Sequence, residues 1–191
     1  MELKSIIICG VGGQGILLAS DVLSDVLIDA GYDVKKSEVH GMSQRGGDVV
    51  STVRYGDKVF SPIVGEGEAD MILAFERLEA LRTLKYLKKD GKLMINDFKW
   101  DPMPVATGTL EYPEDIFDRV KRKTDNIQIV DAVKVAEEIG NIRVANIYLL
   151  GVLAKEMDVK REIWDNVIKR RVPEKAIDVN LKAFDRGYSG N

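Results

Sequence analysis

Apolar and polar positions along the chain predict strands and helices in alternation. An unbroken apolar run within residues 5–9 predicts a buried strand, covered on both faces as in a parallel sheet. Over residues 13–30 the apolar positions recur at three- and four-residue steps, which predicts a helix that Gly31 ends. A second strand is expected over residues 32–39. Residues 40–48 are expected to form a loop, because glycine and polar residues there disfavour a helix.

The middle of the chain continues this alternation after one irregular segment. Residues 49–62 alternate along their first half and contain Gly56 and Asp57, a pair suited to a tight hairpin turn, before Pro62 ends the returning strand. The elements expected next are a strand over 69–75, a helix over 78–88, a turn at Gly91, a strand over 92–97, a helix over 113–123, a strand over 127–131 and a helix with Asp131 as its N-cap.

These elements predict one α/β domain spanning residues 1–191. We expect a doubly wound, mainly parallel, Rossmann-like sheet with a β-hairpin insertion and a helical C-terminal extension. Residues 144–157 are apolar almost all round, so they need cover on two sides, from the chain's own tail helices or from another chain. The basic residues 169–171 are expected to form a solvated helix face. Trp100, beside a proline-containing connection, is either an interface anchor or a residue that closes the edge of its own core.

Composition and charge narrow the possible partners. The chain has 191 residues, 45% of them hydrophobic, and a formal net charge of only −3 with acids and bases interleaved, so we expect no nucleic-acid partner. The longest mostly apolar stretch, VANIYLLGVLA, is shorter than the roughly 20 residues that cross a bilayer. The amino end lacks the features of a signal peptide, so we expect a cytoplasmic protein with no membrane partner. The single cysteine, Cys9, excludes a four-thiolate metal or iron–sulfur site built by this chain alone.

The turn GVGGQG is the first candidate for chemistry. Gly10, Gly12 and Gly15 fit the pattern G-x-G-x-x-G, in which two glycines allow a tight turn with close ligand approach and the third allows close helix packing. Gly13 and Gln14 complete the turn, where the unpaired N–H groups of a helix N-terminus favour an anion. A compact strand-to-helix turn that binds nothing explains the same glycines, so both interpretations remain open.

The loop HGMSQRGGD is the second candidate, and it is expected to face the same crevice. Arg45, followed by Gly46 and Gly47, presents a guanidinium suited to a phosphate or a carboxylate, or else to an ion pair across an interface. His40 is the only histidine in the sequence and is a candidate general base. A histidine in a turn also commonly fixes the backbone by a hydrogen bond, and no nucleophile stands beside this one in the sequence.

Four stretches together resemble a known family. They are GVGGQGILLAS, EVHGMSQRGGDVVSTVRYG, SPIVGEGEADMILAFERLEALR and VPEKAIDVNLKAFDRG. The resemblance is to the gamma-type domain of 2-oxoacid ferredoxin oxidoreductases, covers nearly the whole chain, and is strongest to the beta subunits of the indolepyruvate branch.

The resemblance implies a subunit that is inactive alone. A larger alpha subunit is expected to hold thiamine diphosphate with Mg²⁺ and the [4Fe-4S] clusters, decarboxylate an aryl pyruvate, form an acyl-CoA and reduce ferredoxin in a hetero-oligomer with alpha2beta2 composition. No cofactor or metal is expected on this chain. The glycine turn together with Arg45, Gly46 and Gly47 is then expected to hold the phosphates of coenzyme A or to contact the large subunit.

Two alternatives stand beside this assignment. A free-standing NAD- or nucleotide-binding protein is supported by the glycine turn and by Glu38, which stands about where a dinucleotide fold keeps its ribose-binding acid. An assembly module without any ligand would use the same glycines only to fold and to pack.

Overall fold

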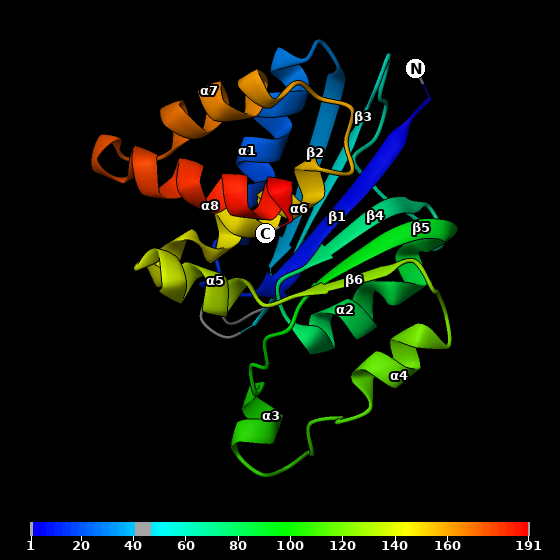
Figure 1. Cartoon of the computed structure of the whole chain (residues 1–191). Helices are drawn as coiled ribbons and strands as arrows, with labels where there is room; N and C mark the ends of the chain where they lie inside the picture. Colours follow the sequence, from blue (N-terminus) through cyan, green and yellow to red (C-terminus); the bar gives the residue numbers. More distant parts are fainter. Residues whose placement is uncertain (1, 41–46, 191) are drawn as a thin grey trace.

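Six strands form one mixed sheet in the order β2-β3-β1-β4-β5-β6, within residues 2–40 and 47–190 that the computed structural model describes (Figure 1). The strands are β1 (Lys4–Val11), β2 (Asp33–His40), β3 (Asp48–Gly56), β4 (Ala69–Ala74), β5 (Leu87–Asn96) and β6 (Ile127–Val130). β1, β4, β5 and β6 pair in parallel, whereas β3 runs antiparallel to both of its neighbours. The predicted mainly parallel α/β sheet is confirmed.

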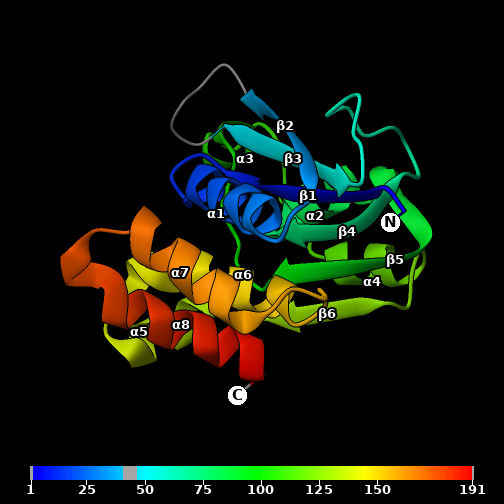
Figure 2. The ribbon, with the colours of Figure 1, turned by 90° about the horizontal axis from the view of Figure 1, so that it is seen from above.

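Helices cover both faces of the sheet, as Figures 1 and 2 show. The helices on one side are α1 (Ile16–Asp29), α5 (Ala132–Ile139), α6 (Ala145–Ala154), α7 (Arg161–Arg171) and α8 (Ile177–Ser189), and those on the other are α2 (Arg77–Thr83) and α4 (Ile116–Lys121). The remaining short elements are α3 (Met103–Ala106) and the 3-10 turns η1 (Leu84–Tyr86), η2 (Ile142–Val144) and η3 (Glu174–Ala176).

The central strand β1 divides the core in two. Ile6 and Ile8 belong to the apolar cluster beneath α1 and the C-terminal helices, whereas Ile7 and Cys9 belong to the cluster beneath α2 and α4. All four side chains are buried, as expected when consecutive apolar residues of a parallel strand point alternately into two covered faces. The buried strand predicted over residues 5–9 is therefore confirmed.

The predicted hairpin turn at Gly56 and Asp57 is wrong. β3 ends at Gly56, and residues 57–68 contain no strand; the antiparallel hairpin instead joins β2 to β3. Asp33 accounts for part of the difference, because its carboxylate accepts a hydrogen bond from the backbone N–H of Val59 (2.8 Å). The segment after Gly56 is therefore held to β2 by a side-chain hydrogen bond, and not by the backbone pairing that was predicted.

The predicted helix over residues 78–88 ends earlier than expected. α2 stops at Thr83, the single turn η1 follows, and β5 begins at Leu87, so Gly91 lies inside a strand. The register between β4 and β5 shifts here, since Leu87 pairs with Ala69 and Lys92 with Met71. Pairing with a distant strand overrides the local helical pattern. The helix predicted over residues 113–123 is likewise shorter, and forms α4.

The C-terminal third is helical, as predicted, and its layer covers α6. Residues Asn146 to Ala154 of α6 are all buried, and α8 lies directly against this helix. The basic residues at the end of α7 are not merely solvated: Arg171 Nε lies 2.6 Å from Asp25 Oδ2, and Arg170 Nη1 lies 2.7 Å from Asp29 Oδ2, both acids on α1. Among the helices described, none combines the length and apolar character needed to cross a bilayer.

Candidate functional site

The glycine loop, residues 10–15, joins β1 to α1 at the carboxyl end of the sheet. Its shape is fixed by Gln14, whose side-chain oxygen accepts from the backbone N–H of Val11 (2.7 Å) and whose Nε2 donates to the carbonyl of Phe75 (3.2 Å). Gln14 therefore ties the loop to the end of the neighbouring strand β4. The carboxyl ends of parallel strands are where open α/β sheets bind ligands.

Gly15 serves both the loop and the packing beneath it. It is the N-cap of α1 with φ of 82°, a left-handed conformation that disfavours other residues. A Cβ at this position would lie 2.4 Å from Nδ2 of Asn146 on α6. The third glycine of the motif thus allows α6 to approach the start of α1, which is the close helix packing that the motif predicts.

Cavities of about 560 and 530 Å³ open among the described residues, and the one of about 530 Å³, at the glycine loop, is the candidate site. This loop cavity of about 530 Å³ is lined by Gly12, Gly13, Gln14, Gly15, Phe75, Asn96, Phe98, Trp100, Val133, Ile142, Arg143, Ala145, Asn146 and Leu149. It therefore lies between the glycine loop, the ends of β4 and β5, and the start of α6. Its volume is within the range of small-molecule sites, roughly 300 to 1,000 Å³.

One wall of the loop cavity is aromatic and apolar. The rings of Phe98 and Trp100 stand 6.2 Å apart at 43°, and Ile142 lies on the η2 turn that also lines the cavity. Trp100 is 45% exposed and Ile142 is 52% exposed, so both stand at the open side. Such a wall is suited to a flat ring or another apolar group of a ligand.

The electrostatic character of the loop cavity is positive. Its described lining residues include one cation, Arg143, and no carboxylate. The N-terminus of the fourteen-residue helix α1 opens onto the same space and contributes a partial positive charge. The cavity therefore combines an apolar wall with groups that favour an anion.

Asn96, the last residue of β5, links the end of β4 to the start of α5. Its buried side chain donates to the carbonyl of Phe75 (3.1 Å) and accepts from the backbone N–H of Ala132 (2.9 Å). The ends of β4 and β5 and the start of α5 are thus linked through one amide group. Sequence reasoning missed Asn96, Phe98, Arg143 and Asn146, because these residues come to line one cavity with the glycine loop only when distant segments of the chain fold together.

The structure places the sequence candidates unevenly. Gly12, Gly13, Gln14 and Gly15 line the loop cavity, and Gly10 lies at the end of β1, where an added Cβ would meet Gln14 and Phe75 at 2.6 and 2.8 Å. From the second loop, Gly47 reaches the first, since its carbonyl accepts from the N–H of Gly12 (2.9 Å). Arg45 and Gly46 lie outside the described residues; His40 ends β2, and its side chain is likewise outside the description.

Glu38, the candidate ribose-binding acid, and the single cysteine both have structural surroundings. Glu38 accepts from Lys36 (2.7 Å) and from the hydroxyl of Ser20 (3.4 Å), and β3 separates its strand from β1, unlike the adjacent strands that a dinucleotide fold uses. Cys9 is fully buried, and burial raises the pKa of its thiol well above the ordinary range, so the thiol stays protonated and unreactive. Among the described residues, no group of three or more His, Cys, Asp or Glu side chains is arranged to hold a metal ion.

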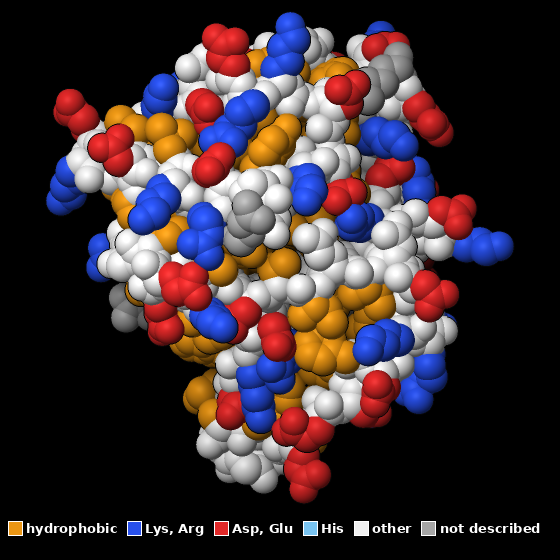
Figure 3. All heavy atoms as spheres, viewed as in Figure 1, with side chains coloured by type: hydrophobic (Ala, Val, Ile, Leu, Met, Phe, Trp, Pro, Cys, Tyr) orange, Lys and Arg blue, Asp and Glu red, His pale blue; other side chains and the backbone are white. Residues whose placement is uncertain are grey.

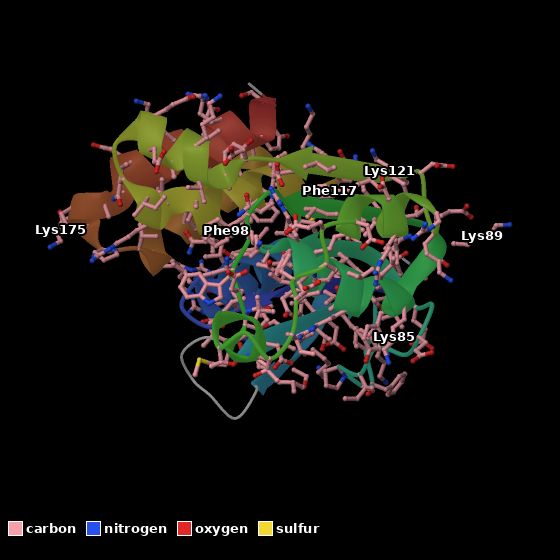
Figure 4. All side chains as sticks on the ribbon, turned by 90° about the horizontal axis from the view of Figure 1, so that it is seen from below. Lys85, Lys89, Phe98, Phe117, Lys121 and Lys175 are labelled. Atoms are coloured by element: carbon pink, nitrogen blue, oxygen red, sulfur yellow. The ribbon has the colours of Figure 1, made fainter. Side chains whose placement is uncertain are left out.

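The second cavity lies away from these features. Its described lining is three leucines, one threonine and six cations, namely Lys85, Lys88, Lys89, Arg119, Arg122 and Lys123. Figure 4 shows Lys85 and Lys89 well to the right of Phe98, toward one edge of the molecule. It shares no lining residue with the loop cavity, and several of its cations pair with nearby acids, as Lys85 does with Glu66 (2.8 Å) and Lys88 with Asp70 (2.8 Å).

The fold and the loop cavity define an α/β protein with a glycine loop at the carboxyl end of its sheet. Residues 5–190 match the family model described as pyruvate ferredoxin/flavodoxin oxidoreductase, and the chain belongs to this family. It is 43% identical to the indolepyruvate oxidoreductase subunit IorB of Pyrococcus horikoshii, across 98% of this chain and 95% of that protein. The IorB subunit of Thermococcus kodakarensis is 42% identical, with the same coverage.

Solved structures agree with this placement. The pyruvate oxidoreductase subunit PORC of Thermotoga maritima superposes with a TM-score of 0.75 at 25% identity, covering 99% of this chain and 97% of that one. The 2-oxoglutarate:ferredoxin oxidoreductase of Magnetococcus marinus, solved with 2-oxoglutarate, coenzyme A and succinyl-CoA bound, shares the fold with a TM-score of 0.75 at 18% identity. The superposition covers 99% of this chain but only 31% of that longer chain.

Proposed function

We infer that this chain is the smaller, IorB-type subunit of an indolepyruvate oxidoreductase. The observation that carries this inference is the identity of 32–43% to four IorB subunits, in alignments that span nearly the full length of both proteins. The mainly parallel sheet and the glycine loop are consistent with it. The rival assignment is a free-standing NAD-binding protein, in which Glu38 would bind the ribose. Lys36 instead donates to the carboxylate of Glu38, which speaks against that role.

We propose a division of labour between two chains. The large subunit would hold thiamine diphosphate with Mg²⁺ and the [4Fe-4S] clusters, and the complex, an alpha2beta2 hetero-oligomer, would convert an aryl pyruvate and CoA to an aryl-acetyl-CoA and CO₂ while reducing ferredoxin. The residues of this chain do not fit an iron–sulfur cluster, since the sequence contains one cysteine and Cys9 is buried. No redox step is therefore assigned to this chain.

Within that complex, we propose that the loop cavity holds part of coenzyme A. A phosphate would bind at the N-terminus of α1 beside Gly12 and Gly13, with Arg143 as the nearest described cation of the cavity, and the adenine ring would stack on Trp100. Arg45, Gly46 and Gly47 of the second loop would contribute to the same site, since the carbonyl of Gly47 accepts from the N–H of Gly12. The chain would thus bind and orient a co-substrate whose reaction occurs on the partner.

Co-expression with the large subunit tests the inferred function. We expect the two chains to co-elute in size-exclusion chromatography, and indolepyruvate-dependent reduction of ferredoxin or of a dye to require both. Each chain alone is the control. Activity of the large subunit alone at the rate of the complex, or nucleotide binding by this chain without any association, would contradict the inference.

Two substitutions test the coenzyme A site in the assembled complex. Trp100→Ala and Arg143→Ala should each raise the KM for CoA about tenfold, because base stacking and a charge-assisted contact contribute roughly 1–3 kcal/mol each. Phe60→Ala is the matched control, since Phe60 is 85% exposed and does not line the cavity. Unchanged KM values with impaired assembly would favour the ligand-free assembly module.

A further inference from the structure

The connection between β5 and α4 projects from the rest of the molecule. We call residues 97–111 the arm. The residues that flank it, Asn96 and Tyr112, are buried, whereas no residue within the arm is. Figure 1 shows α3, the short helix of the arm, set apart from the sheet and from the other helices. Figure 4 shows Phe98 at the start of the arm, on the side of the C-terminal helices.

The arm carries several exposed apolar side chains. Trp100, Met103 and Leu110 are 45%, 69% and 62% exposed, and Pro104 and Ala106 are exposed beside them. Figure 3 shows charged side chains of both signs interspersed over this face, with apolar patches between them. Connections that remain in water are usually polar, and contiguous exposed apolar residues mark interaction sites.

The arm has a defined conformation of its own. The N–H groups of Val105 and Ala106 donate to the carbonyl of Pro102 at 2.8 and 2.9 Å, and the N–H of Leu110 donates to the carbonyl of Pro104 at 2.9 Å. The two prolines fix their own φ angles. An element ordered in this way loses little conformational entropy when it binds, which favours affinity.

The base of the arm is held by one buried carboxylate. Glu76, 1% exposed, accepts from the backbone N–H of Trp100 (3.2 Å) and from the hydroxyl of Tyr112 (2.6 Å). Burial, together with the hydrogen bond to Glu76, raises the pKa of the Tyr112 phenol, so the phenol remains a donor. The backbone carbonyl of Phe98 accepts from the backbone N–H of Arg77 (3.1 Å), at the start of α2. Both ends of the arm are thus fixed to one helix.

We propose that the arm is a docking element for the large subunit. Met103 and Leu110 would insert into an apolar depression on that subunit, and Trp100 would connect the contact to the loop cavity, which it lines. The inference rests on the proposed function. If the loop cavity presents a co-substrate to a centre on another chain, that chain must reach the open side of the cavity, where Phe98 and Trp100 begin the arm. A few apolar anchors commonly supply most of the binding energy of an interface.

The test is a double substitution at the far part of the arm, outside the loop cavity. Met103→Asp with Leu110→Asp should weaken association with the purified large subunit at least tenfold, measured by sedimentation velocity over a concentration series. The melting temperature of the isolated chain should be unchanged, because both side chains are exposed. Ile28→Asp with Phe60→Asp is the matched control, two exposed apolar residues that lie outside the arm. The milder pair Met103→Ser with Leu110→Ser should show a smaller loss in the same direction.

The possible outcomes separate the two claims. The docking role is supported if the unaltered chain and the control variant both bind the large subunit and the arm variant does not. Equal association of the arm variant and the unaltered chain would overturn the docking role and leave the proposed function intact. Failure of the unaltered chain to bind the large subunit would overturn both. A change in the self-association of the isolated chain, with unaltered binding to the large subunit, would make the arm a contact between copies and overturn the docking role.

Discussion

Helix α6 and the arm both carry large apolar side chains, yet only α6 is enclosed by its own chain. α6 carries apolar residues on all sides and is buried from Asn146 onward. The arm exposes Trp100, Met103 and Leu110. An apolar sequence therefore does not by itself locate a core, because burial depends on whether another part of the same chain can reach that segment.

The cover over α6 is supplied by α8 at very short range. A Cβ at Gly151 of α6 would lie 2.3 Å from the carbonyl oxygen of Phe184, and a Cβ at Gly187 of α8 would lie 2.1 Å from that of Tyr148. The two helices thus approach through their backbones. Beside this crossing, the buried rings of Trp164 and Phe184 pack 5.4 Å apart, and this packing completes the layer. In the arm, Val105 is partly buried against the cluster beneath α2 and α4, whereas Trp100, Met103 and Leu110 stay exposed.

Separating α6 from α8 should give the largest effect. Gly151→Ala places a methyl group against backbone atoms that cannot rotate away, so we expect a loss of about 3 kcal/mol in the free energy of unfolding, despite the better helix propensity of alanine. Urea unfolding measures it. Gly56→Ala is the control, since its Cβ would meet Leu3 at an ordinary 3.4 Å. A loss below about 0.5 kcal/mol for Gly151→Ala would show that the helices move apart freely.

Releasing the base of the arm should have the next largest effect. Glu76→Ala removes the acceptor for Trp100, for Tyr112 and for the N–H of Glu79 (3.0 Å) and leaves these donors unpaired. We expect a loss of about 2–3 kcal/mol in unfolding free energy, together with a change in tryptophan fluorescence, because Trp100 loses its anchor. Glu137→Ala, at an exposed acid of α5, is the control. Unchanged fluorescence would contradict the role of Glu76 in fixing the arm.

A pH-dependent effect is expected at Glu79, on the same helix as the base of the arm. Burial, with smaller contributions from the charges of Asp48 and Glu76, raises the pKa of its carboxyl from 4.5 to about 7, although Arg82 opposes the shift. Between these two pH values the folded chain holds a proton that the unfolded chain has lost, so stability falls as pH rises from 4.5 to about 7.

Glu79→Gln should remove this dependence. Relative to the unaltered protein, the variant should gain on the order of 2 kcal/mol in unfolding free energy between pH 5 and pH 8. Urea unfolding at the two pH values measures the gain, and Glu111→Gln, at an exposed acid, is the control. An equal pH dependence in variant and unaltered protein would show that the carboxyl is ionised throughout that range.

The candidate site was only partly predictable. The spacing of Gly10, Gly12 and Gly15 indicated a tight strand-to-helix turn, and the structure has one, with Gly15 in the left-handed conformation. Asn146 is 131 residues from Gly15, and nothing in the local sequence relates the two. The loop cavity therefore became visible only once the C-terminal helices were placed against the glycine loop.

The alternation of apolar runs, helical periodicity and glycines determined the strands β1, β4 and β6, the helix α1 and the α/β class, because these patterns depend on neighbours close in sequence. The tertiary structure alone decided that β3 lies between β1 and β2, that β5 begins at Leu87, and that Arg171 pairs with Asp25. Each of these depends on contacts between segments far apart in the chain. It also decided which apolar segment is covered, enclosing α6 and leaving the arm exposed.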